Sequence, residues 1–210
     1  MLNQSPQRQI ETTIANLYRD SQNDYLKMIG GMAKGLFRPL QPADFKDAYL
    51  SISQEQGEFL TELIKAHQLR NIVEFGTSFG ISTLFLALGA METGGHIITT
   101  ELVETKAQQA LQNFEQAGVE NWIELRVGDA MQTLQDHHEP IDLLLLDGWK
   151  DLYQPLFQLL EPQFHAKTWI YVDNADMRGV QAFLKPIARN PRYKLTFRYH
   201  GKVGLITLNA

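Results

Sequence analysis

The fold of this chain is decided by Asn71–Leu88, which reads NIVEFGTSFGISTLFLAL. A short apolar run over Asn71–Phe75 is followed by a glycine-containing turn and by an apolar segment from Ile81 onward that predicts a helix. Gly76 and Gly80 permit a tight turn and a close approach of the backbone to a ligand, because glycine has no Cβ. A strand, a glycine turn and a helix in this order are typical of nucleotide-binding α/β proteins, although a glycine-rich turn without a ligand fits the same residues.

Apolar runs recur along the rest of the chain, each separated from the next by a helical segment, over His96–Thr100, Trp122–Val127, Ile141–Leu146 and Trp169–Val172. Parallel strands need such crossovers, so the alternation predicts a mostly parallel sheet with helices on both faces. The first helix of the pattern is expected to begin after Ser53, which forms a capping box with Gln56. Two final runs, Lys194–Tyr199 and Val203–Leu208, leave no room for a helix between them and are expected to pair as an antiparallel hairpin. The predicted fold class is α/β, a doubly wound Rossmann-like sheet with N-terminal helices.

The 210 residues, of which 44% are hydrophobic, are enough for one α/β domain with a substantial core and too few for two. We expect a single domain over 1–210, with an N-terminal helical extension over 1–49 and the core over 50–208. Residues 5–29 carry apolar side chains at helical spacing on a polar background. Residues 30–42 are rich in glycine and proline, so they are expected to be irregular and to form either a lid or an ordinary connector.

The composition argues against several classes of partner. A net charge of -5 disfavours a surface that follows nucleic-acid phosphates. The absence of cysteine excludes disulfides, thiolate metal sites and thiol nucleophiles, and it fits a reducing compartment. The first residues are polar, unlike a secretory signal, and no apolar run approaches the roughly 20 residues that span a bilayer. We therefore expect a cytoplasmic protein without a nucleic-acid or membrane partner.

Glu74 points to a cationic cofactor. It stands next to the end of the first predicted strand, where a carboxylate is costly unless it is hydrogen-bonded or faces a cation. S-adenosylmethionine carries a sulfonium and an ammonium group, whereas the pyrophosphate of a dinucleotide would be repelled. The turn also departs from the dinucleotide pattern G-x-G-x-x-G, because Ser78 and Phe79 interrupt it. The residues therefore favour S-adenosylmethionine over a nicotinamide cofactor.

Two further acids follow the next two predicted strands. Glu101 comes directly off its strand, at roughly the usual spacing of about 20 residues from the glycine turn, and can accept hydrogen bonds from both ribose hydroxyls. Glu104, a little further on, is the competing candidate. Asp129, within the turn Gly128–Ala130, is placed to line the adenine, and it is equally well placed to be the N-cap of the following helix.

A group of oxygen ligands follows the fourth and fifth predicted strands. The two segments read LDGWKDLY at 146–153 and YVDN at 171–174. Asp147, Asp173 and Asn174 therefore converge on the edge where open α/β sheets bind ligands. Two carboxylates and an amide oxygen suit Mg²⁺, with Ca²⁺ and Mn²⁺ as alternatives; singly, each residue also fits an ordinary turn.

On these motifs the chain resembles catechol O-methyltransferase and the related metal-dependent, caffeoyl-CoA type O-methyltransferases of bacteria and plants. The segment DGWKDxY at 147–153 is similar to the DHWKDxY segment of that family, and VEFGTSFGIS at 73–82 lies in register with it. The resemblance covers about residues 50–208. It implies a class I fold and transfer of a methyl group from S-adenosylmethionine to a small phenolic acceptor, assisted by a divalent metal. Relatives of this kind often form dimers, so the resemblance implies a homodimer, although no sequence feature demands one.

The resemblance also implies roles for individual residues. Those assigned to the cofactor are Ile52, Glu74, Gly76, Ser78, Ser82, Glu101, Asp129, Ala130 and Asp147. Ser82 would hold the methionine carboxylate, and Lys150 would be the catalytic base, with a structural lysine paired to Asp147 or Asp151 as the alternative. The metal ligands would be Asp147, Asp173 and Asn174. The predicted hairpin turn departs from the family pattern, because it offers no carboxylate for a second substrate hydroxyl.

Three other readings stay open. A metal-independent methyltransferase of another small molecule would keep its activity in a chelator. A catalytically silent S-adenosylmethionine-binding module would bind the cofactor without turnover. A Rossmann oxidoreductase would bind a nicotinamide cofactor and fail to bind S-adenosylhomocysteine.

Overall fold

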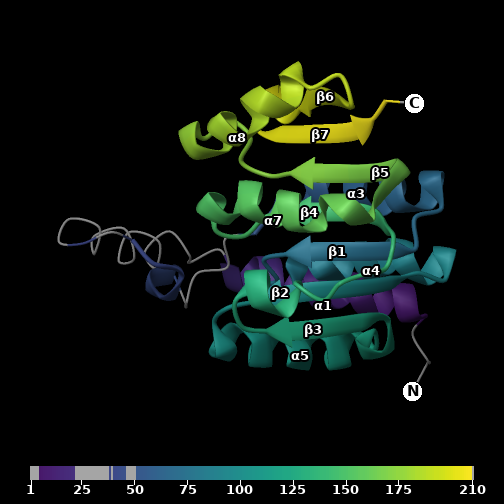
Figure 1. Cartoon of the computed structure of the whole chain (residues 1–210). Coiled ribbons are helices and arrows are strands. Elements are labelled where there is room, and N and C mark those ends of the chain that lie inside the picture. The colour runs from purple at the N-terminus through teal and green to yellow at the C-terminus, as the bar shows by residue number, and fades with distance from the viewer. Residues whose placement is uncertain (1–4, 22–37, 39, 46–50, 210) are drawn as a thin grey trace.

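The chain folds around one seven-stranded sheet, seen in a computed structural model that describes residues 5–21, 38, 40–45 and 51–209. The strand order is β3-β2-β1-β4-β5-β7-β6, and helices cover both faces of the sheet (Figure 1). The strands are β1 (Asn71–Phe75), β2 (His96–Glu101), β3 (Ile123–Val127), β4 (Ile141–Leu146), β5 (Phe164–Val172), β6 (Tyr193–Arg198) and β7 (Val203–Leu208). The helices are α1 (Pro6–Ser21), α3 (Gln54–His67), α4 (Ile81–Thr93), α5 (Glu104–Ala117), α6 (Ala130–Thr133), α7 (Tyr153–Leu160) and α8 (Arg178–Arg189).

The pairing of the strands confirms the predicted fold class. Strands β1 to β5 are parallel to one another, with β1 between β2 and β4, while β7 is antiparallel to both β5 and β6. The predicted strands Asn71–Phe75, Ile141–Leu146 and Val203–Leu208 have the observed bounds. The β5 strand begins earlier than predicted, at Phe164, because Ala166 and Lys167 are exposed and give its first half no apolar signal.

Alternate residues of the strands point to opposite faces and build two cores. On β1, Ile72 packs into the core beneath α1, α3, α4 and α5, whereas Val73 packs into the core beneath α6, α7 and α8. The two neighbours Leu143 and Leu144 of β4 divide in the same way. The side chains on both faces of these strands are therefore buried, which explains why the central strands read as continuous apolar runs.

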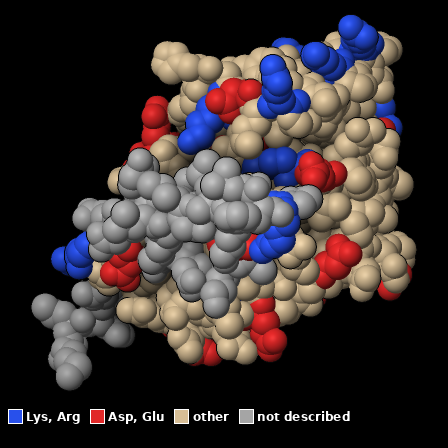
Figure 2. Space-filling model, turned by 90° about the vertical axis from the view of Figure 1, so that its left-hand side faces the viewer, with Lys and Arg blue, Asp and Glu red and all other residues tan. Residues whose placement is uncertain are grey.

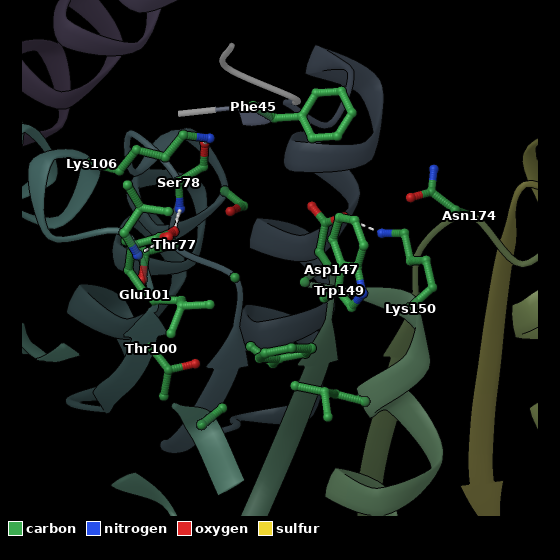
Figure 3. A pocket seen from close by; sticks show the side chains of 18 of the residues that line it. Phe45, Thr77, Ser78, Thr100, Glu101, Lys106, Asp147, Trp149, Lys150 and Asn174 are labelled. Atoms are coloured by element: carbon green, nitrogen blue, oxygen red, sulfur yellow. Dashed lines mark hydrogen bonds and ion pairs between the residues drawn. The ribbon is translucent and has the colours of Figure 1, made fainter. Parts of the chain in front are cut away.

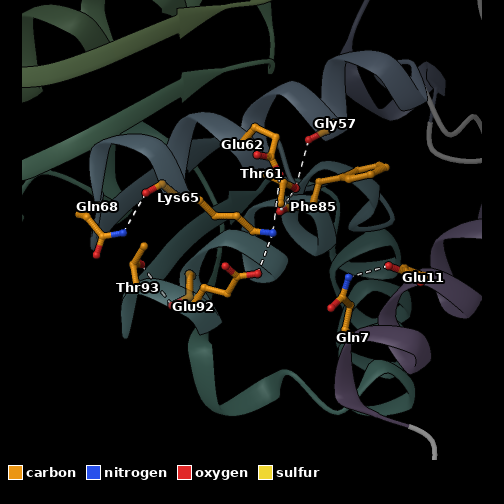
Figure 4. Close-up of polar contacts among 11 residues, drawn as sticks. Gln7, Glu11, Gly57, Thr61, Glu62, Lys65, Gln68, Phe85, Glu92 and Thr93 are labelled. Atoms are coloured by element: carbon orange, nitrogen blue, oxygen red, sulfur yellow. Dashed lines mark hydrogen bonds and ion pairs between the residues drawn. The ribbon is translucent and has the colours of Figure 1, made fainter.

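Side-chain contacts fix α3 on α4. Thr61 Oγ1 donates to the Phe85 carbonyl (2.7 Å), and Lys65 Nζ lies 2.7 Å from Glu92 Oε1 (Figure 4). A Cβ on Gly57 would lie 2.2 Å from the Phe85 ring, so this close approach requires glycine. The start of α3, beside the sheet edge, is therefore held in place by its packing on α4.

The predicted N-terminal helix is present as α1. Its buried side chains Ile10, Ile14 and Leu17 face the core, and Tyr18 Oη donates to the Ile52 carbonyl (2.9 Å). The predicted helical segment after Ser21 and most of the glycine- and proline-rich stretch lie outside the described residues. None of the described helices combines the length and apolar character that a membrane-spanning segment needs.

Candidate cofactor and acceptor site

A cavity of about 810 Å³ lies at the carboxyl ends of β1, β2, β3 and β4 (Figure 3). Most of the predicted cofactor residues line it, namely Ile52, Gly76, Ser78, Ser82, Glu101, Asp129, Ala130 and Asp147. Lys150 and Asn174 line it as well, whereas Glu74 and Asp173 do not. Figure 2 looks onto this edge of the sheet, and in the described part of that face basic side chains are interspersed with acidic and other residues.

The turn after β1 forms the floor of the cavity. Gly76 has a φ of 106°, and a Cβ on it would lie 2.7 Å from the Asp147 carbonyl oxygen. The Gly76 and Thr77 amides both donate to the Thr100 carbonyl, at 3.2 and 3.0 Å. Glycine is therefore required at position 76 both by the left-handed backbone and by the close approach of β4.

Glu74 lies beneath this floor and its side chain does not reach the cavity surface. Its carboxylate accepts hydrogen bonds from Ser82 Oγ (2.6 Å), Thr83 Oγ1 (2.5 Å) and Thr99 Oγ1 (2.6 Å). Burial raises the pKa of Glu74, and the three hydroxyls oppose that rise. The structure thus satisfies the buried acid from inside the protein, and Glu74 contacts the cavity through Ser82.

Glu101 is fixed at the wall of the cavity. Its Oε2 accepts from the Ser78 amide (2.8 Å) and its Oε1 from the Val103 amide (2.9 Å). Each carboxylate oxygen can accept a further hydrogen bond, so the two oxygens stay available to a pair of hydroxyls. Glu104, the competing candidate, is exposed at the start of α5 and does not line the cavity.

Lys106 is a cavity residue that the sequence analysis missed. Its side chain is buried, with a relative exposure of 4%, and Nζ donates to Ser78 Oγ (3.2 Å) and lies 5.2 Å from the centre of the Phe79 ring. The signal in the sequence is weak, because surface lysines are common on such helices. A cation in the first turn of a helix nevertheless opposes the helix dipole, which sets this lysine apart.

Asp129 takes the capping role that its position allowed. Its side chain accepts from the Met131 amide (2.9 Å) and caps α6, while the residue also lines the cavity. Ala130, the first residue of α6, is buried beside it. Asp129 can thus cap α6 and line the cavity at the same time.

Asp147 and Asp173 come directly off adjacent strands. The Asp147 amide donates to the Phe75 carbonyl (2.9 Å) and the Asp173 amide to the Leu146 carbonyl (3.0 Å), so both acids reach the same edge. Burial raises the pKa of Asp147 well above its usual value, and the neighbouring Asp173 carboxylate raises it further, whereas Lys150 lowers it. Two carboxylates with this mutual repulsion make a favourable place for a cation.

Lys150 is partly exposed and contacts both Tyr153 and Asp147. Its Nζ donates to Tyr153 Oη (2.9 Å) and lies 3.6 Å from Asp147 Oδ1. Figure 3 shows Lys150, Asp147 and Asn174 on the same side of the cavity, with Trp149 beside them. Both predicted roles of Lys150, as a base and as a partner of Asp147, are compatible with this position.

Asn174 lines the cavity with a φ of 54°, a left-handed conformation that asparagine tolerates better than most residues. Among the described residues, no group of three His, Cys, Asp or Glu side chains is placed to hold a metal ion. The predicted metal site therefore depends on the asparagine amide as its third protein ligand, beside Asp147 and Asp173.

The strand order and the ligand edge define the class of protein. A mostly parallel sheet with β7 antiparallel between β5 and β6, and a cavity where the parallel strands end, is the architecture of Rossmann-like methyltransferases. The family model for O-methyltransferases matches residues 40–190. The chain belongs to the O-methyltransferase family.

Relatives of known name support this assignment. A catechol O-methyltransferase from Niastella koreensis is 33% identical over 134 residues, which cover 62% of this chain and 60% of the relative. Caffeoyl-CoA O-methyltransferase 1 from Arabidopsis thaliana is 31% identical over 110 residues, which cover 50% of this chain and 42% of the relative. The chain thus spans about half the length of the curated relatives that it matches.

A solved structure covers more of the chain. The O-methyltransferase from Bacillus cereus, in complex with S-adenosylhomocysteine, superimposes with a TM-score of 0.69 at 25% identity. That match covers 87% of this chain and 97% of the other. The agreement extends across the sheet, so the fold is shared as a whole.

Proposed function

We propose that this protein is an S-adenosylmethionine-dependent O-methyltransferase that methylates a hydroxyl of a small phenolic or catechol-like acceptor with the help of a divalent metal. The observation that carries the proposal is one cavity in which the glycine turn and Glu101 stand opposite Asp147 and Lys150. The names of the relatives, catechol and caffeoyl-CoA O-methyltransferase, support a phenolic acceptor.

The wall on the β1–β3 side of the cavity would hold the cofactor. Glu101, already fixed by two backbone amides, would accept the ribose hydroxyls. Asp129 and Ala130 would flank the adenine. The Gly76 turn and Ser82 would hold the methionine part, with the buried Glu74 beneath Ser82 supplying negative charge on the side of the sulfonium.

The acid pair fits a divalent cation. Asp147 has Lys150 at 3.6 Å, whereas Asp173 has the uncharged Gln56 amide at 2.9 Å, so this pair is incompletely neutralised by its described partners. Asp147, Asp173 and Asn174 would hold Mg²⁺, whose preference is for oxygen ligands. A metal bound there would lower the pKa of a hydroxyl that coordinates it, as metals do for water.

The protein's own contribution to the reaction is alignment and proton removal. Lys150 Nζ would take the proton of the acceptor hydroxyl as the general base. The hydroxyl oxygen then forms a bond to the methyl carbon while the carbon–sulfur bond breaks, leaving a neutral thioether. Correct orientation of two reactants contributes about 7–11 kcal/mol in favourable cases, so most of the rate enhancement is assigned to positioning.

The test is titration of S-adenosylhomocysteine by calorimetry, followed by turnover of catechol and caffeate with Mg²⁺ or with a chelator. Binding together with chelator-sensitive turnover supports the whole proposal. Turnover that survives the chelator favours a metal-independent methyltransferase, and binding without any turnover favours a silent binding module. Failure to bind S-adenosylhomocysteine, with binding of a nicotinamide cofactor, would overturn the proposal.

A further inference from the structure

One buried side chain, Gln56, connects the start of α3 to the end of β5. It is 1% exposed, and its Oε1 accepts from the Ser53 amide (2.9 Å) to complete the capping box. Its Nε2 donates to Tyr171 Oη (3.1 Å) and to Asp173 Oδ1 (2.9 Å). The amide oxygen is thus engaged locally, three residues away, whereas the amide nitrogen binds groups 115 and 117 residues away in the sequence.

The helix cap alone does not explain a glutamine at this position. A capping box needs only an acceptor at its third helical residue, and glutamate fills that role as well as glutamine. The two N–H groups therefore serve another purpose, and their partners are Tyr171 and Asp173. The hydrogen bond to Asp173 fixes one carboxylate oxygen of a residue that the proposed function makes a metal ligand.

The Gln56 amide is uncharged, and this matters as much as its geometry. Within the acid pair, Asp147 has the Lys150 ammonium near it, whereas Asp173 is held by a neutral donor. A lysine at position 56 would hold the same oxygen and would cancel its charge. Gln56 instead orients the Asp173 carboxylate and leaves its full charge to attract a cation.

The same side chain reaches the cofactor cavity through the backbone. Ile52 lines the cavity and directly precedes Ser53, whose amide and hydroxyl are both bound to Gln56. The capping box therefore sets the path of this segment of the cavity wall. Gln56 thus connects two parts of the site by hydrogen bonds. One is the cavity-lining segment at Ile52 and Ser53, and the other is the acid Asp173.

We propose that Gln56 is a positioning residue that orients the Asp173 carboxylate toward a divalent cation without neutralising it. The inference rests on the proposed metal-assisted function. Partners that orient metal ligands in this way typically contribute 10–100-fold to metal affinity.

The test measures Mn²⁺ affinity by calorimetry in the full chain, with S-adenosylhomocysteine affinity and thermal unfolding measured on the same preparations. Gln56→Met removes one hydrogen bond of the capping box, from the Ser53 amide, together with the donor to Asp173. Ser53→Ala removes the other hydrogen bond of the box, to the Ser53 hydroxyl, and keeps the donor, so it is the matched control. Gln56→Lys keeps a donor and adds a charge, and it provides a second comparison if Gln56→Met does not fold.

We expect Ser53→Ala to bind Mn²⁺ within about 2-fold of wild type, and both Gln56→Met and Gln56→Lys to bind it at least ~10-fold more weakly. If wild type binds Mn²⁺ normally and the Ser53→Ala and Gln56 variants all bind it with equal affinity, this inference is wrong. The proposed metal dependence is not affected by that result. Absence of Mn²⁺ binding to wild type, beside normal S-adenosylhomocysteine binding, overturns the proposed metal dependence and this inference with it.

Discussion

Glu74 and Glu101, at the ends of neighbouring strands, have different surroundings and therefore different roles. The Glu74 carboxylate receives three side-chain hydroxyls inside the protein, whereas the Glu101 carboxylate receives two backbone amides at the cavity wall. Thr99 pairs with Glu74, and Glu101 lies two residues further along β2, where the strand ends at the edge of the sheet. Only Glu101 is therefore placed to touch a ligand directly.

Replacing Glu101 by alanine is expected to weaken S-adenosylhomocysteine binding about 10- to 100-fold. A hydrogen bond to a charged group contributes roughly 1.5–3 kcal/mol, and 1.4 kcal/mol corresponds to about tenfold in affinity. Calorimetric titration measures the change, with Glu104→Ala as the control because that acid lies outside the cavity. An unchanged affinity in the Glu101 variant would show that the ribose is held elsewhere.

The buried carboxyl of Glu74 should make stability depend on pH. Its pKa in the folded state is raised above the ordinary value of 4.5, so the folded state binds its proton more tightly than the unfolded state does. This contribution is fully present below about pH 4.5 and is lost as the pH rises through the folded pKa. We expect the free energy of unfolding of wild type to fall relative to that of Glu74→Gln over this range.

Urea unfolding of wild type and Glu74→Gln between pH 4 and pH 8 measures this difference. Other titrating groups are common to the two proteins, so the difference between the two curves reports on Glu74. Glu74→Leu is a useful companion, since it leaves the hydroxyls of Ser82, Thr83 and Thr99 without their acceptor. Parallel pH profiles for wild type and Glu74→Gln would contradict the raised pKa.

At the scale of elements, the turn between β1 and α4 is the most constrained connection of the site. Its backbone is left-handed at Gly76 and again at Gly80, and it passes within contact distance of the end of β4. The turn therefore has little freedom to relax around an added side chain, which makes it a sensitive point for substitution.

Gly76→Ala is expected to destabilise the protein by about 2 kcal/mol or more, from backbone strain and from the clash with the Asp147 carbonyl. Gly179→Ala is the matched control. Gly179 lies in the first turn of α8, and a Cβ there meets nothing within 4 Å, so the change should stabilise by about 0.4–1 kcal/mol. Denaturant unfolding measures both, and similar effects of the two substitutions would contradict the prediction.

The sequence predicted an element best where a single local pattern, such as a continuous apolar run or a capping box, determined its position. The Asn71–Phe75 and Ile141–Leu146 strands are buried on both faces and were predicted with their observed bounds. The capping box at Ser53 was also confirmed, including both of its hydrogen bonds. The second use of Gln56 was not predictable, because its partner Asp173 is 117 residues away and only the folded sheet brings them together.

Some site predictions depended on the direction of a side chain, which the sequence does not fix. Glu74 was expected to contact the cofactor, but the pleat of β1 turns it toward hydroxyls from α4 and β2. Lys106 was missed because a lysine on an amphipathic helix usually reaches solvent, whereas here it lies over Phe79. Residue types at strand ends were therefore more predictable than their exact contacts.

At the scale of the whole molecule, the parallel sheet gathers the ends of separate strands into one binding edge. A ligand there contacts β1, β2, β3 and β4 together, so binding should stabilise the fold as a unit. A ligand at about 100 times its Kd stabilises by about 2.7 kcal/mol. For a chain of this size, each kcal/mol raises Tm by roughly 2–4 °C.

Saturating S-adenosylhomocysteine is therefore expected to raise Tm by about 5–11 °C, which differential scanning fluorimetry or calorimetry can measure. A nicotinamide dinucleotide at the same concentration should leave Tm unchanged, because the turn lacks the dinucleotide pattern. A larger shift with the dinucleotide would favour the oxidoreductase reading instead.

The order of strands at the far edge of the sheet has a consequence for biosynthesis. In the folded sheet β7 lies between β5 and β6, although β6 precedes it in the chain (Figure 1). A ribosome therefore releases β6 before the strand that must separate it from β5. Until Val203–Leu208 emerges, the nascent protein presents the β5 edge without its final neighbour, and unpaired edges are where growing chains associate wrongly. Among the strands of the described sheet, β7 is thus translated after both of its neighbours, and it covers the edge of β5 only once it has emerged.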